Sequence, residues 1–195
     1  MTATDLQSRD AKLAASLVVL VFALCAYFYN GWGWNQTARY DPIWAFVEPG
    51  PNRGTLRIDD FVTDPAAGLN TGDWARNADH SPHYYSNKAP GTTFLGIPFY
   101  FALYHVERLL GVEPTEMGPV LVNAYLIHLW VTVLPVALSA AFFFALLRRL
   151  GREAHEAYAL TVLLYCGTLL WPFSTMLWGH TTAAALVVAS LWCFV

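Results

Sequence analysis

The segment Leu13-Ala-Ala-Ser-Leu-Val-Val-Leu-Val-Phe-Ala-Leu-Cys-Ala-Tyr-Phe-Tyr29 decides the fold class of this chain. It carries no charged side chain, and it approaches the length of about 20 residues that a helix needs to cross the hydrocarbon core of a bilayer. Arg9 and Lys12 precede it. Because positive charge favours the cytoplasmic side, we expect a transmembrane helix over 13–29, with residues 1–12 in the cytoplasm.

A cleaved signal peptide is the competing interpretation of this segment. The apolar run is long for a signal peptide, and Gly31-Trp32-Gly33-Trp34 follows it in place of an A-x-A-like cleavage site. Tryptophans at that place are typical of the aromatic belt at a membrane–water interface. The sequence therefore favours an uncleaved membrane anchor.

The composition of the whole chain agrees with a membrane protein. Of its 195 residues 56% are hydrophobic and only 13% are charged, and the mean hydropathy is +0.38. A soluble domain is usually less apolar and richer in charge. The net charge of -3 does not indicate a nucleic-acid partner. The three cysteines lie inside apolar runs without the spacing of a zinc site, so we interpret them as buried small hydrophobic side chains.

Three later runs are also long and apolar enough to span a bilayer, namely 120–147, 157–173 and 177–195. The run 92–110 is ambiguous, because it contains a proline and ends in polar residues. The basic cluster in 148–152 decides between its two interpretations, since such a cluster is expected in the cytoplasm. Counted from a cytoplasmic N-terminus, the basic cluster lies on the cytoplasmic side only if 92–110 is an interfacial helix rather than a span.

The predicted fold class is therefore an all-α integral membrane protein with about four transmembrane helices. Residues 30–91 form an outer loop on the periplasmic or extracellular side, and the interfacial helix 92–110 follows it. The last apolar run ends at Val195 without a polar flank, which indicates the N-terminal part of a longer protein.

The outer loop is rich in charged side chains. A carboxylate can act as a base or bind a metal, and a cation can neutralise a departing phosphate, so the loop has the ingredients of a group-transfer site. The alternative for any single acid is a solvated side chain without a specific role. The acids are Asp41, Glu48, Asp59, Asp60, Asp64, Asp73 and Asp79, and the cations are Arg39, Arg53, Arg57, Arg76 and Lys88.

Three short motifs in this loop are the first candidates. Arg39-Tyr40-Asp41 lies close after the first span, where an arginine can bind a phosphate and an aspartate can bind a metal or accept a proton. Asp59-Asp60 would point to opposite faces if it lay in a strand, so one of the two suffices for a site. Asn70-Thr71-Gly72-Asp73 is typical of a turn, and a structural role for it is an equal alternative.

The motif Tyr84-Tyr85-Ser-Asn-Lys88-Ala-Pro-Gly91 contains the sharpest candidate. The Ala-Pro-Gly that follows Lys88 predicts the start of the interfacial helix, whose N-terminal amides would add affinity for an anion. Lys88 is therefore predicted to contact a lipid phosphate, with a snorkelling lysine as the alternative. Tyr84 and Tyr85 are either interface anchors or sugar platforms. His180 either lines the site or caps the membrane boundary.

These motifs together resemble the GT-C type polytopic membrane glycosyltransferases, in particular the bacterial protein mannosyltransferases, lipid A aminoarabinose transferases and RgtA/B/C/D-like enzymes. The resemblance runs along the whole chain. It rests on Arg39-Tyr40-Asp41, Gly54-Thr-Leu-Arg-Ile-Asp59-Asp60, Thr71-Gly72-Asp73, Tyr84-Tyr-Ser-Asn-Lys-Ala-Pro-Gly91, Leu147-Arg-Arg-Leu-Gly151 and Gly179-His180, in this order.

The resemblance implies an outer loop folded into juxtamembrane helices and inverting sugar transfer from a polyprenyl-phosphate carrier, at the outer face of the bacterial inner membrane. The acceptor would be an envelope glycan, a lipid or a protein. Lys88 matches the lysine of the group's Lys-Pro-Pro or Lys-Ala-Pro element, which implies a phosphate contact. Many relatives carry an acidic pair just before the Arg-Tyr, whereas this chain has Asn35-Gln36-Thr37-Ala38. The catalytic carboxylate is therefore open among Asp41, Asp59 and Asp60.

The hypothesis from the sequence is a glycosyltransferase, or its N-terminal portion. Asp41, Asp59 or Asp60 would activate the acceptor, or Asp41 and Asp59 would hold a divalent metal. Lys88 and Arg39 would neutralise the lipid phosphate, and the lining of the site would come from Asp73, Tyr84, Tyr85 and His180. The alternative is a non-catalytic scaffold or a transporter fragment whose outer loop binds a partner. Transporters usually place ionisable residues inside their spans, and these spans contain few.

Overall fold

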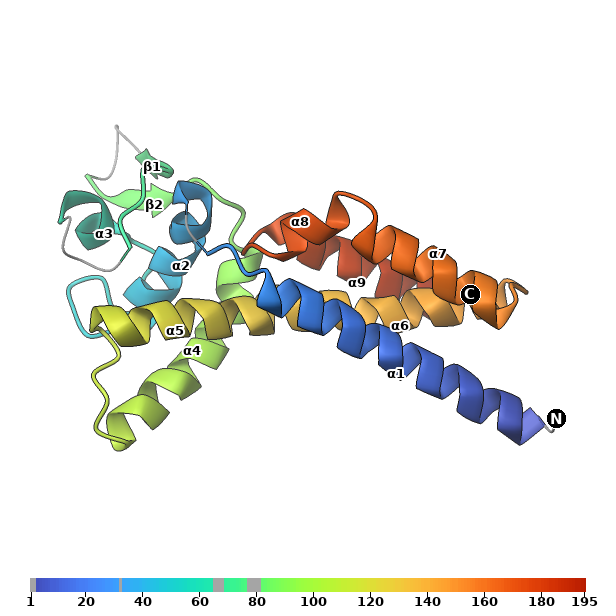
Figure 1. Ribbon diagram of the computed structural model, residues 1–195. Helices are drawn as coiled ribbons and strands as arrows, with labels where there is room; N and C mark the ends of the chain where they lie inside the picture. Colours follow the sequence, from blue (N-terminus) through green and yellow to red (C-terminus); the bar gives the residue numbers. More distant parts are fainter. Residues whose placement is uncertain (1–2, 32, 65–68, 77–81) are drawn as a thin grey trace. The chain divides into compact units, whose positions relative to one another are not determined.

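The structure is a computed structural model that describes residues 3–31, 33–64, 69–76 and 82–195. It is mostly helical, as the sequence predicts, and the described residues add one two-stranded sheet (Figure 1). The chain divides into two compact units. We call residues 1–29, 132–176 and 180–195 the helical unit, and residues 30–131 and 177–179 the mixed unit.

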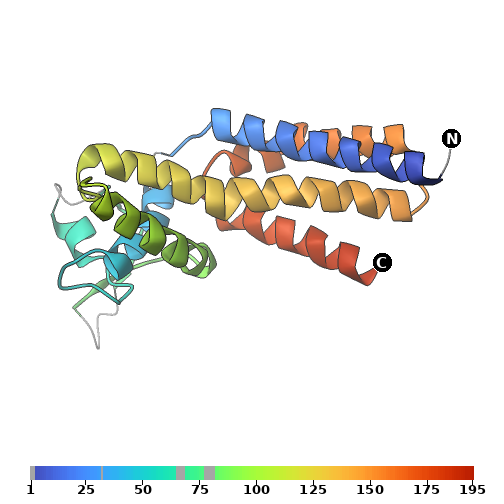
Figure 2. The same ribbon diagram turned by 90° about the horizontal axis from the view of Figure 1, so that it is seen from below.

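The helical unit contains α1 (Ala3–Tyr27), α6 (Leu134–Arg149), α7 (Ala154–Cys166), α8 (Leu170–Ser174) and most of α9 (Gly179–Phe194). Helix α1 packs along α6 and also contacts α7, so residues far apart in the sequence lie side by side (Figure 2). The hydroxyl of Ser16 in α1 lies 3.4 Å from that of Tyr158 in α7. The first apolar segment is therefore part of the packed unit.

Two stretches, Gln7–Tyr27 and Met117–Arg149, are long and apolar enough to cross a membrane by length and composition, and α9 is a shorter apolar helix. Only 17% of the most apolar window of the first stretch is buried. Val19, for example, is 67% exposed. A helix that is both apolar and uncovered by its own protein is unusual for a soluble core and is typical of a surface that faces lipid or another protein.

The apolar run predicted over 120–147 forms α5 (Met117–His128) and α6, joined by a π-helical turn, η1 (Leu129–Val133). Pro135 follows directly, in the first turn of α6. A proline has no N–H to donate and its ring crowds the carbonyl four residues earlier, so the wider turn accommodates it without ending the helical path.

The apolar run predicted over 157–173 is divided in the structure. Helix α7 ends at Cys166 with Gly167 as its C-cap, and α8 begins three residues later. The hydroxyl of Thr168 accepts a hydrogen bond from the amide of Leu170 at 3.2 Å and donates one to the carbonyl of Leu164 at 2.7 Å. These bonds replace helical ones, because a glycine and a threonine favour helix ends over helix interiors.

The mixed unit contains α2 (Trp34–Val47), α3 (Asp59–Thr63), α4 (Gly91–Leu109) and α5. Helix α2 packs on α4, and the two share a buried aromatic core that includes Trp44 and Tyr100. Gly96 permits this close approach, since a Cβ at that position would lie 2.4 Å from Cδ1 of Ile43. The phenol of Tyr100 donates a hydrogen bond of 2.6 Å to Glu48 at the C-terminal end of α2.

The small sheet of the mixed unit consists of β1 (Trp74–Arg76) and β2 (Tyr84–Ser86), paired antiparallel with Ala75 opposite Tyr85. The all-α prediction did not include it. Aromatic side chains favour paired strands, and the rings of Trp74 and Tyr84 meet edge to face at 4.8 Å. The guanidinium of Arg76 lies over the Tyr84 ring. This ribbon brings the segment before Lys88 next to the segment that contains Asp73.

Candidate functional site

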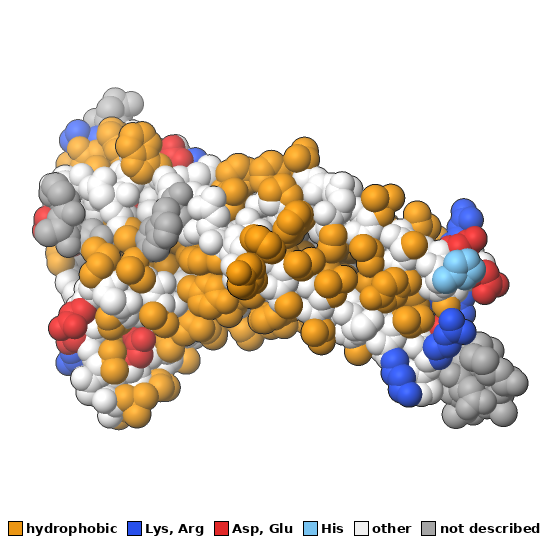
Figure 3. All heavy atoms as spheres, viewed as in Figure 1, with side chains coloured by type: hydrophobic (Ala, Val, Ile, Leu, Met, Phe, Trp, Pro, Cys, Tyr) orange, Lys and Arg blue, Asp and Glu red, His pale blue; other side chains and the backbone are white. Residues whose placement is uncertain are grey.

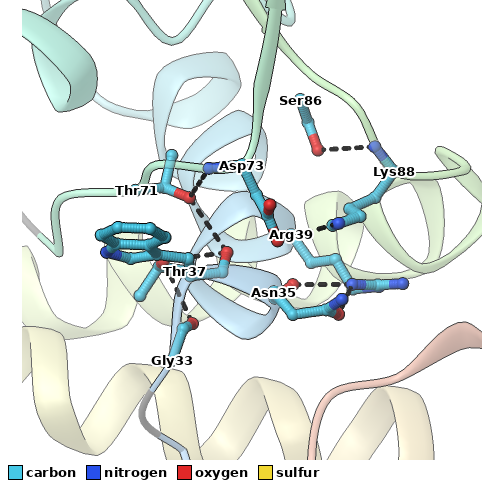
Figure 4. A network of polar contacts seen from close by, with 9 residues as sticks. Gly33, Asn35, Thr37, Arg39, Thr71, Asp73, Ser86 and Lys88 are labelled. Carbon is cyan, nitrogen blue, oxygen red and sulfur yellow. Dashed lines mark hydrogen bonds and ion pairs between the residues drawn. The ribbon is translucent and has the colours of Figure 1, made fainter.

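Lys88 lies between strand β2 and helix α4. Its backbone amide donates to the hydroxyl of Ser86 at 3.2 Å, which fixes the turn that leads into the helix (Figure 4). Helix α4 begins at Gly91 after Pro90, and none of the described side chains caps it. The amides of its first turn are therefore available to an anion, as the sequence predicts for this position.

The ammonium group of Lys88 pairs with the carboxylate of Asp73. Nζ of Lys88 lies 2.9 Å from Oδ2 of Asp73, and the two side chains are 17% and 30% exposed. Arg39 lies close to this pair (Figure 4), and the charge of Asp73 opposes the lowering of the Arg39 pKa by burial. We call these three residues the Arg39–Asp73–Lys88 cluster. It carries two positive charges and one negative charge, so it has one positive charge in excess.

The position of Asp73 is set by the start of helix α2. The amide of Asp73 donates to the hydroxyl of Thr71 at 3.1 Å, and that hydroxyl donates to the carbonyl of Trp34 at 2.9 Å (Figure 4). Between them, Gly72 lies so close to the Trp34 ring that a Cβ would stand 2.7 Å from a ring carbon. Thr71-Gly72-Asp73 therefore has the structural role of a turn, and this turn delivers Asp73 to the cluster.

Arg39 is held on α2 from one turn earlier. Its guanidinium donates to the carbonyl of Asn35 at 2.6 Å and to the side-chain oxygen of the same residue. The side chain is buried, and burial lowers the pKa of Arg39 while the nearby Asp73 opposes that shift. Its Nε has no hydrogen-bond partner among the described residues. A buried guanidinium with a spare donor is suited to bind an oxyanion.

Asp41 lies two residues further along α2 and is fully buried. Neither of its carboxyl oxygens has a hydrogen-bond partner in the described part of the chain. Burial raises the pKa of this carboxyl well above its usual range, because an isolated charge is costly in a medium of low dielectric. Buried carboxyls that no structural contact uses occur preferentially at functional sites.

A cavity of about 220 Å³ adjoins the cluster. It is bounded by α2, the segment around Leu56, strand β2 and the start of α4, and most of its walls are apolar. Lys88 supplies a charged side chain to it, and Tyr85 supplies an aromatic one. The residues that line it are Pro42, Leu56, Tyr85, Ser86, Lys88, Pro90 and Thr93.

The Asp59-Asp60 pair has structural contacts instead. It begins helix α3 and does not lie in a strand. Asp59 accepts the amide of Tyr84 at 2.6 Å and pairs with Nδ1 of His83 at 2.7 Å, which fastens α3 to strand β2. Asp60 accepts the side-chain amide of Asn52 at 3.1 Å. His83 was not among the predicted site residues, and only its place before the tyrosines could have indicated this contact.

The remaining predicted residues differ in where they lie. Tyr85 lines the cavity, whereas Tyr84 packs against the exposed edge of the sheet through Trp74 and Arg76. His180 is the second residue of α9 and belongs to the helical unit, and its role at the site stays a prediction.

The divalent metal that Asp41 and Asp59 were predicted to hold stays a prediction. Within residues 3–31, 33–64, 69–76 and 82–195, no three histidine, cysteine or acidic side chains come together as a set of ligands. Both oxygens of Asp59 already have partners in His83 and Tyr84. The charges that the site offers to a phosphate are those of Lys88 and Arg39.

Comparison with known proteins gives no match to a family model, to a curated protein or to a solved structure.

Proposed function

We propose that this chain is a membrane glycosyltransferase of the GT-C type, or a portion of one, which transfers a sugar from a polyprenyl-phosphate carrier to a glycan, lipid or protein acceptor. The observation that carries the proposal is the Arg39–Asp73–Lys88 cluster, in which Lys88 pairs with Asp73 and Arg39 lies nearby, beside an apolar cavity. An excess positive charge next to apolar walls suits a ligand that is both anionic and greasy, as a lipid phosphate is.

Membrane insertion is the second half of the proposal. It is supported by the two stretches that are long and apolar enough to span, and by the small buried fraction of the first of them. Helix α4 ends in the charged residues Glu107 and Arg108 and carries Pro98, which suits an interfacial helix better than a spanning one. The mixed unit would then lie at the outer membrane surface.

In the proposed reaction the acceptor hydroxyl oxygen bonds to the anomeric carbon of the donor sugar while the bond from that carbon to the phosphate oxygen breaks. The phosphate leaves with an added negative charge, which Lys88 and Arg39 neutralise. The hydroxyl proton passes to a carboxylate, for which we propose Asp41, which directly precedes Pro42 of the cavity wall. Asp59 and Asp60 are less suitable, because contacts with His83, Tyr84 and Asn52 occupy their carboxylates.

A transfer assay with a polyprenyl-phosphate sugar and the full chain in lipid nanodiscs tests the proposal. Lys88→Ala and Asp41→Asn should each lower the transfer rate by roughly a hundredfold or more, the scale of a lost transition-state cation or general base. Arg53→Ala is the matched control, since Arg53 is an exposed cation of the same unit that does not line the cavity. Transfer at the wild-type rate by both variants would refute the assignment.

A further inference from the structure

The helical unit contains a second cavity, of about 370 Å³, between helices α1, α6 and α9. Its walls are apolar and include Ala11, Ala14, Phe144 and Trp192. Two arginines at the C-terminal end of α6, Arg148 and Arg149, also line it. Figure 3 shows Lys and Arg side chains gathered at this end of the unit, next to a surface of hydrophobic side chains. The cavity thus combines apolar walls with positive charge.

The two arginines differ in how their charge is balanced. Nε of Arg148 pairs with Asp10 of α1 at 2.8 Å, so its charge has a carboxylate partner. Arg149 donates to the carbonyl of Trp192 at 2.8 Å, and its guanidinium lies 4.5 Å from the centre of the Trp192 ring. Neither contact supplies a negative charge. Among the side chains that the structure describes, no carboxylate lies within ion-pair distance of Arg149, which is exposed.

Trp192 offers a second group without a partner. Its ring is held against Phe142 of α6 with the centroids 5.1 Å apart. Its indole Nε1 is buried and has no hydrogen-bond acceptor in the described part of the chain. A buried donor of this kind favours an acceptor from a ligand, because leaving it unpaired has a desolvation cost. Arg149 and Trp192 together thus present a cation and a donor at one cavity.

We propose that this cavity binds the phosphate headgroup of an anionic phospholipid, with an acyl chain along its apolar wall. Arg149 contacts the phosphate oxygens through its fork of N–H groups, and the indole N–H of Trp192 supplies a further donor. Because basic clusters are expected on the cytoplasmic side, this end of the unit would face the cytoplasm. Anionic lipids bind basic pockets between helices on that side. The assignment rests on the proposed membrane insertion but not on glycosyl transfer.

Equilibrium binding of fluorescent phosphatidylglycerol to the full chain in neutral detergent micelles tests this site. Arg149→Gln should weaken binding about fivefold, the effect of removing one basic residue near a membrane surface. Trp192→Phe keeps the ring but removes the N–H, and should also weaken it. Arg152→Gln is the matched control, since Arg152 is an exposed arginine of the same basic cluster that does not line the cavity. Arg149→Lys keeps the charge and should retain part of the affinity. This variant therefore distinguishes the loss of a charged contact from a folding defect.

Two further ligands distinguish the source of the phosphate. Phosphatidylcholine should bind more weakly than phosphatidylglycerol and should not respond to Arg149→Gln. Millimolar inorganic phosphate should not displace the lipid. Displacement by inorganic phosphate would assign the cavity to a soluble anion, and equal binding by wild type and Arg149→Gln would overturn the site. Because sugar transfer is not measured, failure here leaves the proposed transferase function to its own assay.

Discussion

Nζ of Lys88 and Oδ2 of Asp73 lie 2.9 Å apart, although 15 positions separate these residues in the sequence. Asp73 therefore already provides Lys88 with the negative charge that a donor phosphate would provide. A phosphate that binds the cluster has to compete with this carboxylate for the cation.

Replacement of Asp73 by asparagine should remove that competition. We expect Asp73→Asn to lower the KM for the phosphate donor by up to about fivefold, the upper range for a partly exposed ion pair, without raising kcat. The backbone bond from residue 73 to Thr71 is kept in this variant. Steady-state kinetics at varied donor concentration measures both constants. A loss of kcat of a hundredfold or more, in the range for a general base, would instead make Asp73 the proton acceptor.

Asp41→Asn should stabilise the mixed unit near neutral pH. Burial raises the pKa of Asp41, so the folded chain holds the proton more tightly than the unfolded chain, whose carboxyl has a pKa of about 3.9. The stability that this group contributes is present below that value and is lost as the pH rises toward the folded pKa. Asparagine carries no charge and avoids the loss.

The midpoint of thermal unfolding measured at about pH 4 and about pH 7 checks this prediction, because the first value lies near the unfolded carboxyl pKa. Asp41→Asn should unfold at a higher temperature than wild type at the higher pH only. Glu116→Gln, an exposed acid of the same unit, should show no such difference. A lower midpoint for Asp41→Asn at both values would mean that the ionised carboxylate has a partner and is stabilising.

Gly96→Ala tests the contact between α2 and α4. A methyl group there would overlap Cδ1 of Ile43, whose side chain is fully buried. We expect destabilisation by about 1–3 kcal/mol, the usual cost of overpacking a core. Gly91→Ala is the matched control in the same helix, since its added Cβ would meet no described atom within 4 Å apart from its chain neighbours and the backbone of the helix. Denaturant unfolding compares them, and equal stability of the two variants would disprove the close approach.

Tyr100→Phe should destabilise the same contact by about 1–3 kcal/mol, because the partly buried Glu48 loses its hydrogen bond and keeps its desolvation cost. Tyr104→Phe is the control in the same helix, since the Tyr104 phenol forms no hydrogen bond with the described residues. Denaturant unfolding that ranks Tyr104→Phe below Tyr100→Phe in stability would contradict the role of Glu48.

Local sequence patterns were enough to predict several elements. The apolar run from Leu13 predicts α1, and Ala-Pro-Gly91 predicts where α4 begins, because both depend on neighbouring residues alone. The division of the run 157–173 at Gly167 was not predicted, since its apolar composition outweighed one glycine. The π-helical turn before Pro135 was not predicted either, because it depends on how the helix adapts to a missing donor.

The candidate site was predictable in its residue types but not in their pairing. Lys88, Arg39 and Asp73 were all among the predicted site residues. Their grouping depends on the hairpin of β1 and β2 and on the close packing of Gly72 against Trp34, which are contacts over long sequence distances. The same holds for the acids, because Asp59 is distinguished from Asp41 only by the partners that the fold gives to each.

Equilibrium binding tests most directly whether Lys88 binds the phosphate of a polyprenyl carrier. The full chain in nanodiscs is titrated with a short polyprenyl phosphate, with the uncharged polyprenol as the reference ligand. Lys88→Ala should bind the phosphate at least about tenfold more weakly than wild type, the scale of one lost charged hydrogen bond, and Arg53→Ala should bind it unchanged. An affinity of Lys88→Ala equal to that of wild type, or equal binding of the phosphate and the polyprenol, would contradict the claim.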